Sequence, residues 1–235
     1  FISKQGEGLK KWKPQNYGKK FYGPSTLRMG VEKSRNLMTV RVAQKLGFEK
    51  ISKISRDLGV YDNVPELLSV SLGSNETTLL KITNAYCTFV NGGKKISPHL
   101  ITRIQDRRGK TIFNFDKRKC VGCEILKFDE EFVPNIIDEN KQVISAETAY
   151  QMTSILEGVV KRGTGKKLKP LNVPLAGKTG TTNNNFDAWF IGFTSDLAIG
   201  VYIGYDEPKS LGKFETGSKA ALPIFKDFIE RAVYK

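Results

Sequence analysis

The residues best suited to chemistry lie in the stretch LAGKTGTTNNNFDAWF, residues 175–190. Lys178 offers a positive charge, Thr179 a hydroxyl, and Gly180 a backbone without a side chain. On a strand beside a cleft, this lysine triad could hold a carboxylate and let a peptide pair along the strand edge. Thr179 and Thr181 share one face of such a strand because side chains alternate along it, so both hydroxyls could meet the same anion.

A second candidate is the Ser-x-Asn element, residues 34–36, which lies far upstream of the lysine triad. Taken alone, the pattern is common and more typical of a cap between helices than of a site, since serine and asparagine side chains bond readily to nearby backbone. The two patterns together and in this order are much less common. The combination therefore singles out Ser34, Asn36 and Lys178, but it does not by itself give them a catalytic role.

A nucleophilic serine with a lysine three residues later is not found before Ser34. Ser3 and Ser25 precede it, and neither has this partner. The pattern does occur at Ser210 to Lys213, after the lysine triad, in a loop flanked by proline and glycine. A serine nucleophile needs a base fixed beside it, so we expect Ser210 not to be catalytic.

The composition is that of a globular protein. The chain has 235 residues, of which 39% are hydrophobic and 26% charged, and it holds no apolar run long enough for a membrane helix. It begins at Phe1 without methionine or a signal segment. We therefore expect it to be a piece of a larger protein.

The charge leaves a binding function open. The net charge of +14 could favour nucleic acid, an anionic lipid surface or an acidic polymer, or it could reflect a lysine-rich solvated surface. A polyanion-binding module predicts exposed aromatic residues among the basic ones on one face. Phenylalanine and tryptophan instead recur at spacings typical of a core, so we rank this alternative below catalysis.

The three cysteines do not indicate a metal site. Cys120 and Cys123 form a C-x-x-C pair, but zinc needs two further ligands, and the remaining candidates are Cys87 and His99. We expect no metal, Cys87 in packing, and a structural role for His99. Cys120 and Cys123 could form a local disulfide or remain two free thiols.

Helical patterns dominate the first part of the chain. Ser25 is a candidate N-cap, and after Asn36 one apolar face runs to Gly47. Further helices are expected at residues 52–59 and 77–91. Residues 1–95 are thus a mainly helical lobe that carries the Ser-x-Asn element.

Hairpin and strand patterns follow. Residues 98–113 read as a hairpin with its turn at 106–109, and 114–142 as loop, so that 96–142 form a hairpin and loop insertion. Ser145 caps a helix that ends at the Gly-Thr-Gly turn of residues 163–165. Three antiparallel strands and a last helix are then expected, at 174–181, 187–194, 197–205 and 220–233. This order predicts an α+β fold.

Four segments resemble, in order, the transpeptidase domain of class A, 1A-type bifunctional penicillin-binding proteins: GPSTLRMGVEKSRNLMTVRVAQKLG, SLGSNETTLLKITNAYCTFVNGG, SAETAYQMTSILEGVVKRGTG and PLAGKTGTTNNNFDAWFIGFT. Such enzymes combine an S-x-x-K, a Ser-x-Asn and a K-T-G element. The resemblance implies the fold shared with serine β-lactamases, an antiparallel sheet flanked by helices plus a helical lobe. It also implies that residues 1–235 are the C-terminal part of one such domain, incomplete at its N-terminus.

The resemblance implies a role for each candidate. Ser34 would help pass a proton to the leaving D-alanine, and Asn36 would hold the amide of the donor peptide. Lys178 would supply a positive field and bond to Ser34. Thr179 and Thr181 would bind the terminal carboxylate of the donor, with Gly180 giving clearance. The backbone N–H of Thr181 would form half of an oxyanion hole, a type of donor whose loss raises the barrier by roughly 3 kcal/mol.

The implied function is D-alanyl-D-alanine transpeptidation, which cross-links peptidoglycan stem peptides through an acyl-serine intermediate and needs no cofactor. Implied partners are the lipid-linked precursor, the stem peptides and β-lactams, with no nucleic acid. The parent would be anchored in the bacterial inner membrane, face the periplasm and carry a glycosyltransferase domain. A D,D-carboxypeptidase or β-lactamase-like hydrolase of the same fold is the alternative. Because no S-x-x-K element precedes Ser34, we expect this piece alone to be inactive.

Overall fold

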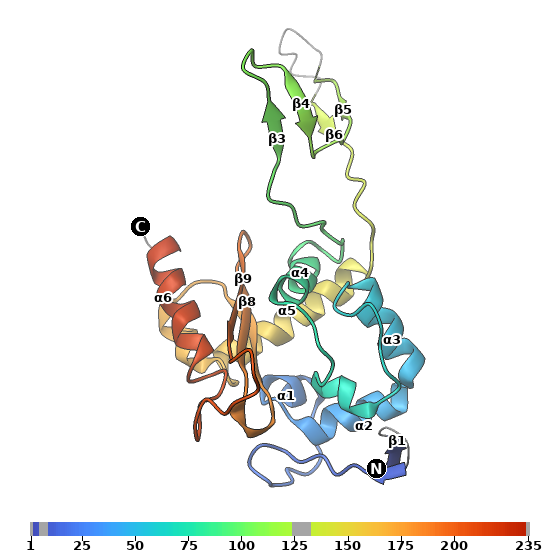
Figure 1. Ribbon diagram of the computed structural model, residues 1–235, viewed down its shortest axis with the longest axis vertical. Helices are drawn as coiled ribbons and strands as arrows, with labels where there is room; N and C mark the ends of the chain where they lie inside the picture. The colour runs from blue at the N-terminus through green and yellow to red at the C-terminus, as the bar shows by residue number, and fades with distance from the viewer. Residues whose placement is uncertain (1, 5–8, 124–132, 234–235) are drawn as a thin grey trace.

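The computed structural model describes residues 2–4, 9–123 and 133–233. It is an α+β fold with an antiparallel sheet between layers of helices, and a narrow arm extends away from this body (Figure 1). The predicted fold class is confirmed.

Three strands form the central sheet in the order β7, β8, β9, and both neighbouring pairs are antiparallel. Their bounds are Ala176–Thr181, Ala188–Phe193 and Ala198–Ile203. Each strand lies within the range expected from the sequence. The antiparallel pairing was also expected, because connections of a few residues can join only antiparallel neighbours. Strand β7, which carries the lysine triad, pairs with β8 on one side and lies at the edge of this sheet.

Helix α6, Ala221–Val233, covers one face of the sheet. Phe190 of β8 and Phe225 of α6 are fully buried there, with their ring centroids 4.7 Å apart in an edge-to-face arrangement. Trp189 points to the opposite face and packs on Tyr202, but it is only half-buried. Phe190 therefore belongs to the core, whereas Trp189 on the opposite face belongs to it only in part.

Helices α4, Leu79–Val90, and α5, Ala146–Lys161, cover the other face. Leu156 and Val159 of α5 pack with residues at the ends of β7 and β8. The hydroxyl of Ser145 accepts the backbone N–H of Thr148 at 3.2 Å, as expected for its role as N-cap. This packing fixes the turn after α5 relative to β7.

The helical lobe contains α1, Leu27–Glu32, α2, Asn36–Leu46, and α3, Phe48–Asp57. Helix α2 ends at Gly47 as predicted. The predicted cap of α1 is wrong by one residue: Thr26, not Ser25, accepts the N–H of Met29, at 3.2 Å. Both residues are good caps, and only the position at which the helical dihedrals begin decides between them.

Short elements complete the body. In the part of the chain that the structure describes, two strands near the start pair with each other, and three 3₁₀ turns connect longer elements. Their bounds are β1 Ile2–Lys4, β2 Leu9–Lys11, η1 Leu68–Leu72, η2 Lys166–Leu171 and η3 Asn183–Asn185.

The arm, residues 96–142, contains two small antiparallel pairs. Strands β3, Arg103–Gln105, and β4, Thr111–Asn114, form the predicted hairpin, while β5, Cys120–Val121, and β6, Asn135–Ile136, lie in the stretch expected to be loop. Cys120 and Cys123 form a disulfide, which decides between the two alternatives left by the sequence. Within the described residues, no helix is long and apolar enough to cross a membrane.

Candidate active site

The Ser-x-Asn element lies at the junction of two helices. Lys33 is the C-cap of α1, Arg35 is the N-cap position of α2, and Asn36 is the first residue of α2. Between them, Ser34 has a φ of 52°, a left-handed conformation that costs a non-glycine residue about 1–3 kcal/mol. The surrounding contacts must therefore hold this turn in place.

Ser34 and Lys178 are brought together across 144 residues of sequence. Lys178 Nζ donates to Ser34 Oγ at 2.8 Å and to the carbonyl oxygen of Thr179 at 2.9 Å. The first of these is the hydrogen bond that the resemblance implies. Burial of the amine lowers the pKa of Lys178 to about 8, because an ammonium loses hydration in the interior.

The direction of this hydrogen bond determines what Ser34 can do. Lys178 is a donor in its protonated form, so the oxygen of Ser34 is the acceptor and the Ser34 hydrogen stays available. A pKa near 8 also makes the neutral amine accessible at little cost near neutral pH. The pair is thus chemically able to pass a proton to a group bound beside Ser34.

Thr179 and Thr181 of β7 each have a hydrogen bond that fixes the position of the side-chain hydroxyl. Thr179 Oγ1 shares a hydrogen bond of 2.7 Å with Thr164 Oγ1, from the turn that follows α5. Thr181 Oγ1 accepts the backbone N–H of Gly217 at 3.0 Å, which leaves its own hydrogen free to donate. That both hydroxyls meet one anion stays a prediction.

The backbone N–H of Thr181 points to the free edge of β7. Thr182 donates its N–H to Asp187 O at 3.1 Å, so Thr182 and Asp187 form a hydrogen-bonded pair across the β7–β8 ladder. Such pairs alternate with pairs whose N–H groups point away from the partner strand, and Thr181 opposite Ala188 is of this second kind. The geometry is therefore compatible with an oxyanion-hole donor at Thr181.

Gly180 has no side chain, so another segment can approach its backbone closely, and in the structure that segment is the one around Gly217. A Cβ added to Gly217 would overlap the carbonyl oxygens of Gly180 and Trp189. This tight contact brings the segment before α6 against the end of β7. Clearance for a bound peptide at Gly180 stays a prediction.

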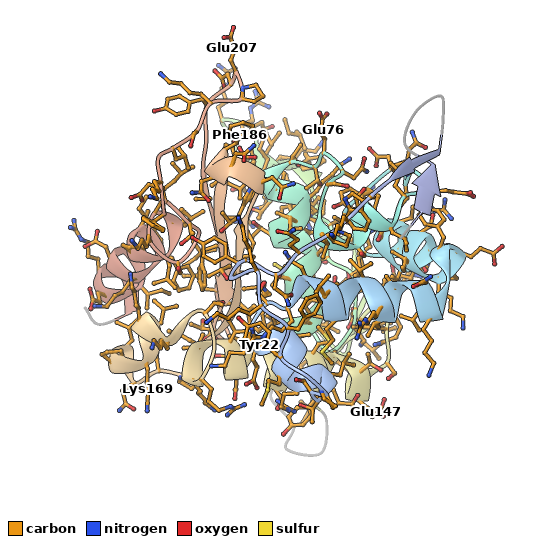
Figure 2. All side chains as sticks on the ribbon, turned by 90° about the horizontal axis from the view of Figure 1, so that it is seen from below. Tyr22, Glu76, Glu147, Lys169, Phe186 and Glu207 are labelled. Atoms are coloured by element: carbon orange, nitrogen blue, oxygen red, sulfur yellow. A yellow bond between two sulfur atoms is a disulfide. The ribbon has the colours of Figure 1, made fainter. Side chains whose placement is uncertain are left out.

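Asn36 is held by the N-terminal segment. Its side-chain nitrogen donates to the carbonyl oxygen of Gln15 at 2.9 Å. The neighbouring Asn16, which is 7% exposed, accepts the free N–H of Leu37 at 3.2 Å and so caps α2 from outside the helix. Tyr22 and Arg35 add a cation–π contact, and Figure 2 labels Tyr22 in the lower middle of the view.

Sequence reasoning missed Asn16 and Thr164 as parts of the site. In the sequence Thr164 stands only as part of a Gly-Thr-Gly turn, and nothing around Asn16 indicates a role for it. No local pattern could identify them, because their partners are distant in sequence.

The remaining candidates lie outside this cluster. Ser210 donates to Asn184 O at 2.9 Å in an irregular loop, not at a helix start. His99 stacks on Phe115 in the arm, with ring centroids 3.6 Å apart. Cys87 is free and partly buried, and burial raises the pKa of its thiol. In the part of the chain that the structure describes, no three His, Cys, Asp or Glu residues gather in a way that could hold a metal ion.

The chain is similar to penicillin-binding proteins in sequence and in structure. Residues 2–230 match the family model of the penicillin-binding protein transpeptidase domain. Penicillin-binding protein 1A of Rickettsia bellii is 48% identical over 230 residues, which are 97% of this chain and 29% of that protein. Penicillin-binding protein 1A of Pseudomonas aeruginosa is 36% identical, over 92% of this chain and 30% of that protein.

A solved structure gives the same relation. The crystal structure of penicillin-binding protein 1A from Haemophilus influenzae superposes with a TM-score of 0.80 at 27% identity, over 98% of this chain and 38% of that one. The chain thus spans well under half the length of each of these relatives.

Proposed function

The chain belongs to the transpeptidase-domain family of penicillin-binding proteins, and on this premise we propose that it is part of an enzyme that cross-links peptidoglycan stem peptides. Residues 1–235 would be the C-terminal part of one transpeptidase domain. Its subdivisions would be the helical lobe at 1–95, the arm insertion at 96–142, and the sheet with its helices at 143–235. The nucleophilic serine and its lysine would come from sequence outside this chain.

The proposed reaction is acyl transfer. The serine oxygen attacks the carbonyl carbon between the two terminal D-alanines of a stem peptide, and the bond to the last D-alanine breaks. That D-alanine leaves with a proton on its nitrogen, and the peptide is held as an ester on the serine. An amine of a second stem peptide then displaces the serine oxygen, which recovers a proton and leaves a new amide.

Each residue of the site has a part in this proposal. Ser34 passes the proton to the leaving nitrogen, and Lys178 sets its electrostatics through the 2.8 Å hydrogen bond. Thr181 donates its free hydroxyl hydrogen to the substrate carboxylate and its backbone N–H to the developing oxyanion. Thr179 and Asn36 position the donor peptide, and Gly180 leaves room for its backbone.

The hydrogen bond between Ser34 and Lys178 supports the proposal most directly. It joins a lysine of lowered pKa to the hydroxyl of a serine in a left-handed turn. The net charge of +14 does not account for such a pair, because charge of this kind concerns only binding at the surface. A polyanion-binding surface needs no such buried pair. We further propose that the parent faces the outside of the cytoplasmic membrane, where stem peptides and β-lactams would reach it.

The proposal is tested by acylation with a labelled penicillin. We expect the full-length protein that carries this chain to bind one label per molecule, and the chain of residues 1–235 to bind none. Lys178→Met in the full-length protein should slow acylation by about 10²–10⁴-fold, the usual range for a proton-transfer group. A stoichiometric label on Ser34 or Ser210 of the isolated chain would contradict the assignment.

The hydrolytic alternative is separated by product analysis. With a stem pentapeptide and an amine acceptor, the full-length protein should release D-alanine and form the new amide, which mass spectrometry detects. Release of D-alanine with free tetrapeptide and no amide would identify a carboxypeptidase instead.

A further inference from the structure

A buried carboxylate lies two residues before Ser34. Glu32 is the last residue of α1 and is 4% exposed, although glutamate is rarely buried unless it is paired. The resemblance gives it no role. A buried charge is retained only where its partners are in place, and removing one partner of such a pair is strongly destabilising.

The partners of Glu32 come mainly from the C-terminal end of α5. Arg162 donates Nε to one carboxylate oxygen at 3.2 Å and a second guanidinium nitrogen to the other. Arg28, one turn earlier on α1, lies 3.9 Å from the carboxylate. A Cβ on Gly158 would overlap the Glu32 carboxylate, so the helix surface is shaped to admit it. This two-point pairing fixes orientation as well as distance.

The backbone joins the same two elements. Thr164 donates its N–H to the carbonyl oxygen of Glu32 at 3.2 Å, and Lys33 Nζ donates to the carbonyl oxygen of Arg162. A Cβ on Gly163 would overlap the Glu32 carbonyl oxygen. The end of α1 and the turn after α5 are therefore locked together by both side chains and main chain.

These contacts form a closed ring of hydrogen-bonded and neighbouring residues in the candidate active site: Glu32, Thr164, Thr179, Lys178 and Ser34. Thr164, held by Glu32, bonds through its hydroxyl to Thr179 at 2.7 Å. Thr179 follows Lys178 on β7, and Lys178 bonds to Ser34, two residues after Glu32. Each of the two catalytic elements is thus tied to the turn at Thr164.

We propose that Glu32 is a positioning residue, which acts with Arg162 and Thr164 to hold Ser34 within hydrogen-bond distance of Lys178. Its catalytic consequence rests on the proposed function, whereas the geometric part does not. A left-handed serine at a turn would relax without such support. Opening the ring separates the hydroxyl from the amine and admits water to Lys178.

The geometric part is tested on residues 1–235 by measuring the pKa of Lys178 with NMR of isotope-labelled lysine. The value should be about 8 in the unchanged chain. Glu32→Gln should raise it by roughly one unit or more, because added hydration favours the ammonium. Glu157→Gln is the matched control: Glu157 pairs with Lys161 at 2.7 Å on the exposed side of α5, so its loss should leave the Lys178 pKa unchanged.

A second variant covers the case in which Glu32→Gln does not fold. Thr164→Val keeps the ion pair and the shape but removes the hydroxyl bonded to Thr179, and it should also raise the Lys178 pKa. Thr148→Val, which removes a hydroxyl bonded to Ser145 at the other end of α5, is its control. If the folded Glu32 and Thr164 variants match their controls, the ring does not position the pair.

The catalytic consequence is measured separately in the full-length protein. Glu32→Gln should lower the acylation rate at saturating penicillin about tenfold or more, while Glu157→Gln should not. If the unchanged full-length protein is not acylated, the proposed function fails, and the NMR comparison still decides the geometric part. An unchanged acylation rate in a variant with a raised Lys178 pKa would reject the catalytic consequence alone.

Discussion

The surroundings of Lys178 are unlike those of an ordinary surface lysine, because its amine is buried. Its amine has two hydrogen-bond acceptors, Ser34 Oγ and the Thr179 carbonyl oxygen, yet neither carries a charge. The ammonium therefore loses water without gaining a counter-ion among the described residues, and its pKa falls. The same feature that suits the lysine to proton transfer makes its charged form costly to the fold.

This cost predicts a pH dependence of stability. The pKa of Lys178 falls from its usual 10.5 to about 8 in the folded chain. Between these values the unfolded chain binds a proton that the folded chain has released, so the free energy of unfolding rises with pH across this window. Relative to Lys178→Met, which does not titrate, the unchanged chain should gain on the order of 1–3 kcal/mol. Urea unfolding of both proteins from about pH 8 to pH 10 measures the difference.

Comparison with Lys178→Met cancels the contribution of the other titrating groups to the pH dependence of stability. Surface lysines and tyrosines also change charge in this window, but they do so equally in both proteins, so they cancel in the difference. A difference that stays flat or falls with pH would show that Lys178 is not desolvated in the folded chain.

At the scale of elements, helix α2 depends on a residue outside it. Arg35 stands at the N-cap position and makes no side-chain cap bond, and the free N–H of Leu37 goes to Asn16 instead. Asn16 also donates to Lys20 O at 2.8 Å, which folds the segment back on itself. The helix that begins with Asn36 is therefore anchored by the segment laid across it.

Asn16→Ala should destabilise the chain by about 1 kcal/mol, the typical value of a lost cap. Asn16→Asp keeps the acceptor oxygen for Leu37 and should recover most of the loss. Gln15→Ala is the control, because Gln15 contacts Asn36 through its backbone carbonyl and its side chain is exposed. Thermal or urea unfolding measures all three, and equal losses for Asn16→Ala and Gln15→Ala would rule out the cap.

The elements themselves could be predicted because their signals are local. The strand at residues 174–181, the cap at Ser145 and the stop at Gly47 each depend on a few neighbouring residues. The contacts of Glu32 and Asn16 could not be predicted in this way. Their partners lie 130 and 21 residues away, and nothing in a six-residue helix indicates which of its charges will be buried. The Ser34–Lys178 pair came from the resemblance, not from periodicity.

At the scale of the whole molecule, the body and the arm differ in how much of their side chains is buried. Buried residues from the sheet and from helices on both of its faces form the body's core. In the arm, every residue of β3, β4 and β6 is exposed. Figure 1 shows the arm leading away from the helices, and Figure 2 shows Glu207 at another outlying tip of the chain. The sequence set residues 96–142 apart as an insertion, but it did not indicate that Ile104 and Phe113 are exposed, because they are as apolar as core residues.

Contacts at its base join the arm to the body. Lys94 pairs with Asp138 at 2.6 Å and bridges to Gln142, and Lys95 donates its N–H to Lys141 O. These contacts join the two ends of the arm, after α4 and before α5. The arm can therefore unfold locally beyond them without moving either helix.

The disulfide in the arm should therefore have a local effect. Cys120 and Cys123 are three residues apart, so the bond closes a very short loop within the arm. In the double variant Cys120→Ser, Cys123→Ser, we expect the thermal transition of the body to shift by less than about 1 °C, because the cooperative unit is the buried core. Amide hydrogens of residues 103–121 should exchange faster, whereas those of β8 should not change. Mass spectrometry of hydrogen exchange resolves the two regions, and a lowered transition with faster exchange in β8 would show instead that the arm and the body unfold as one unit.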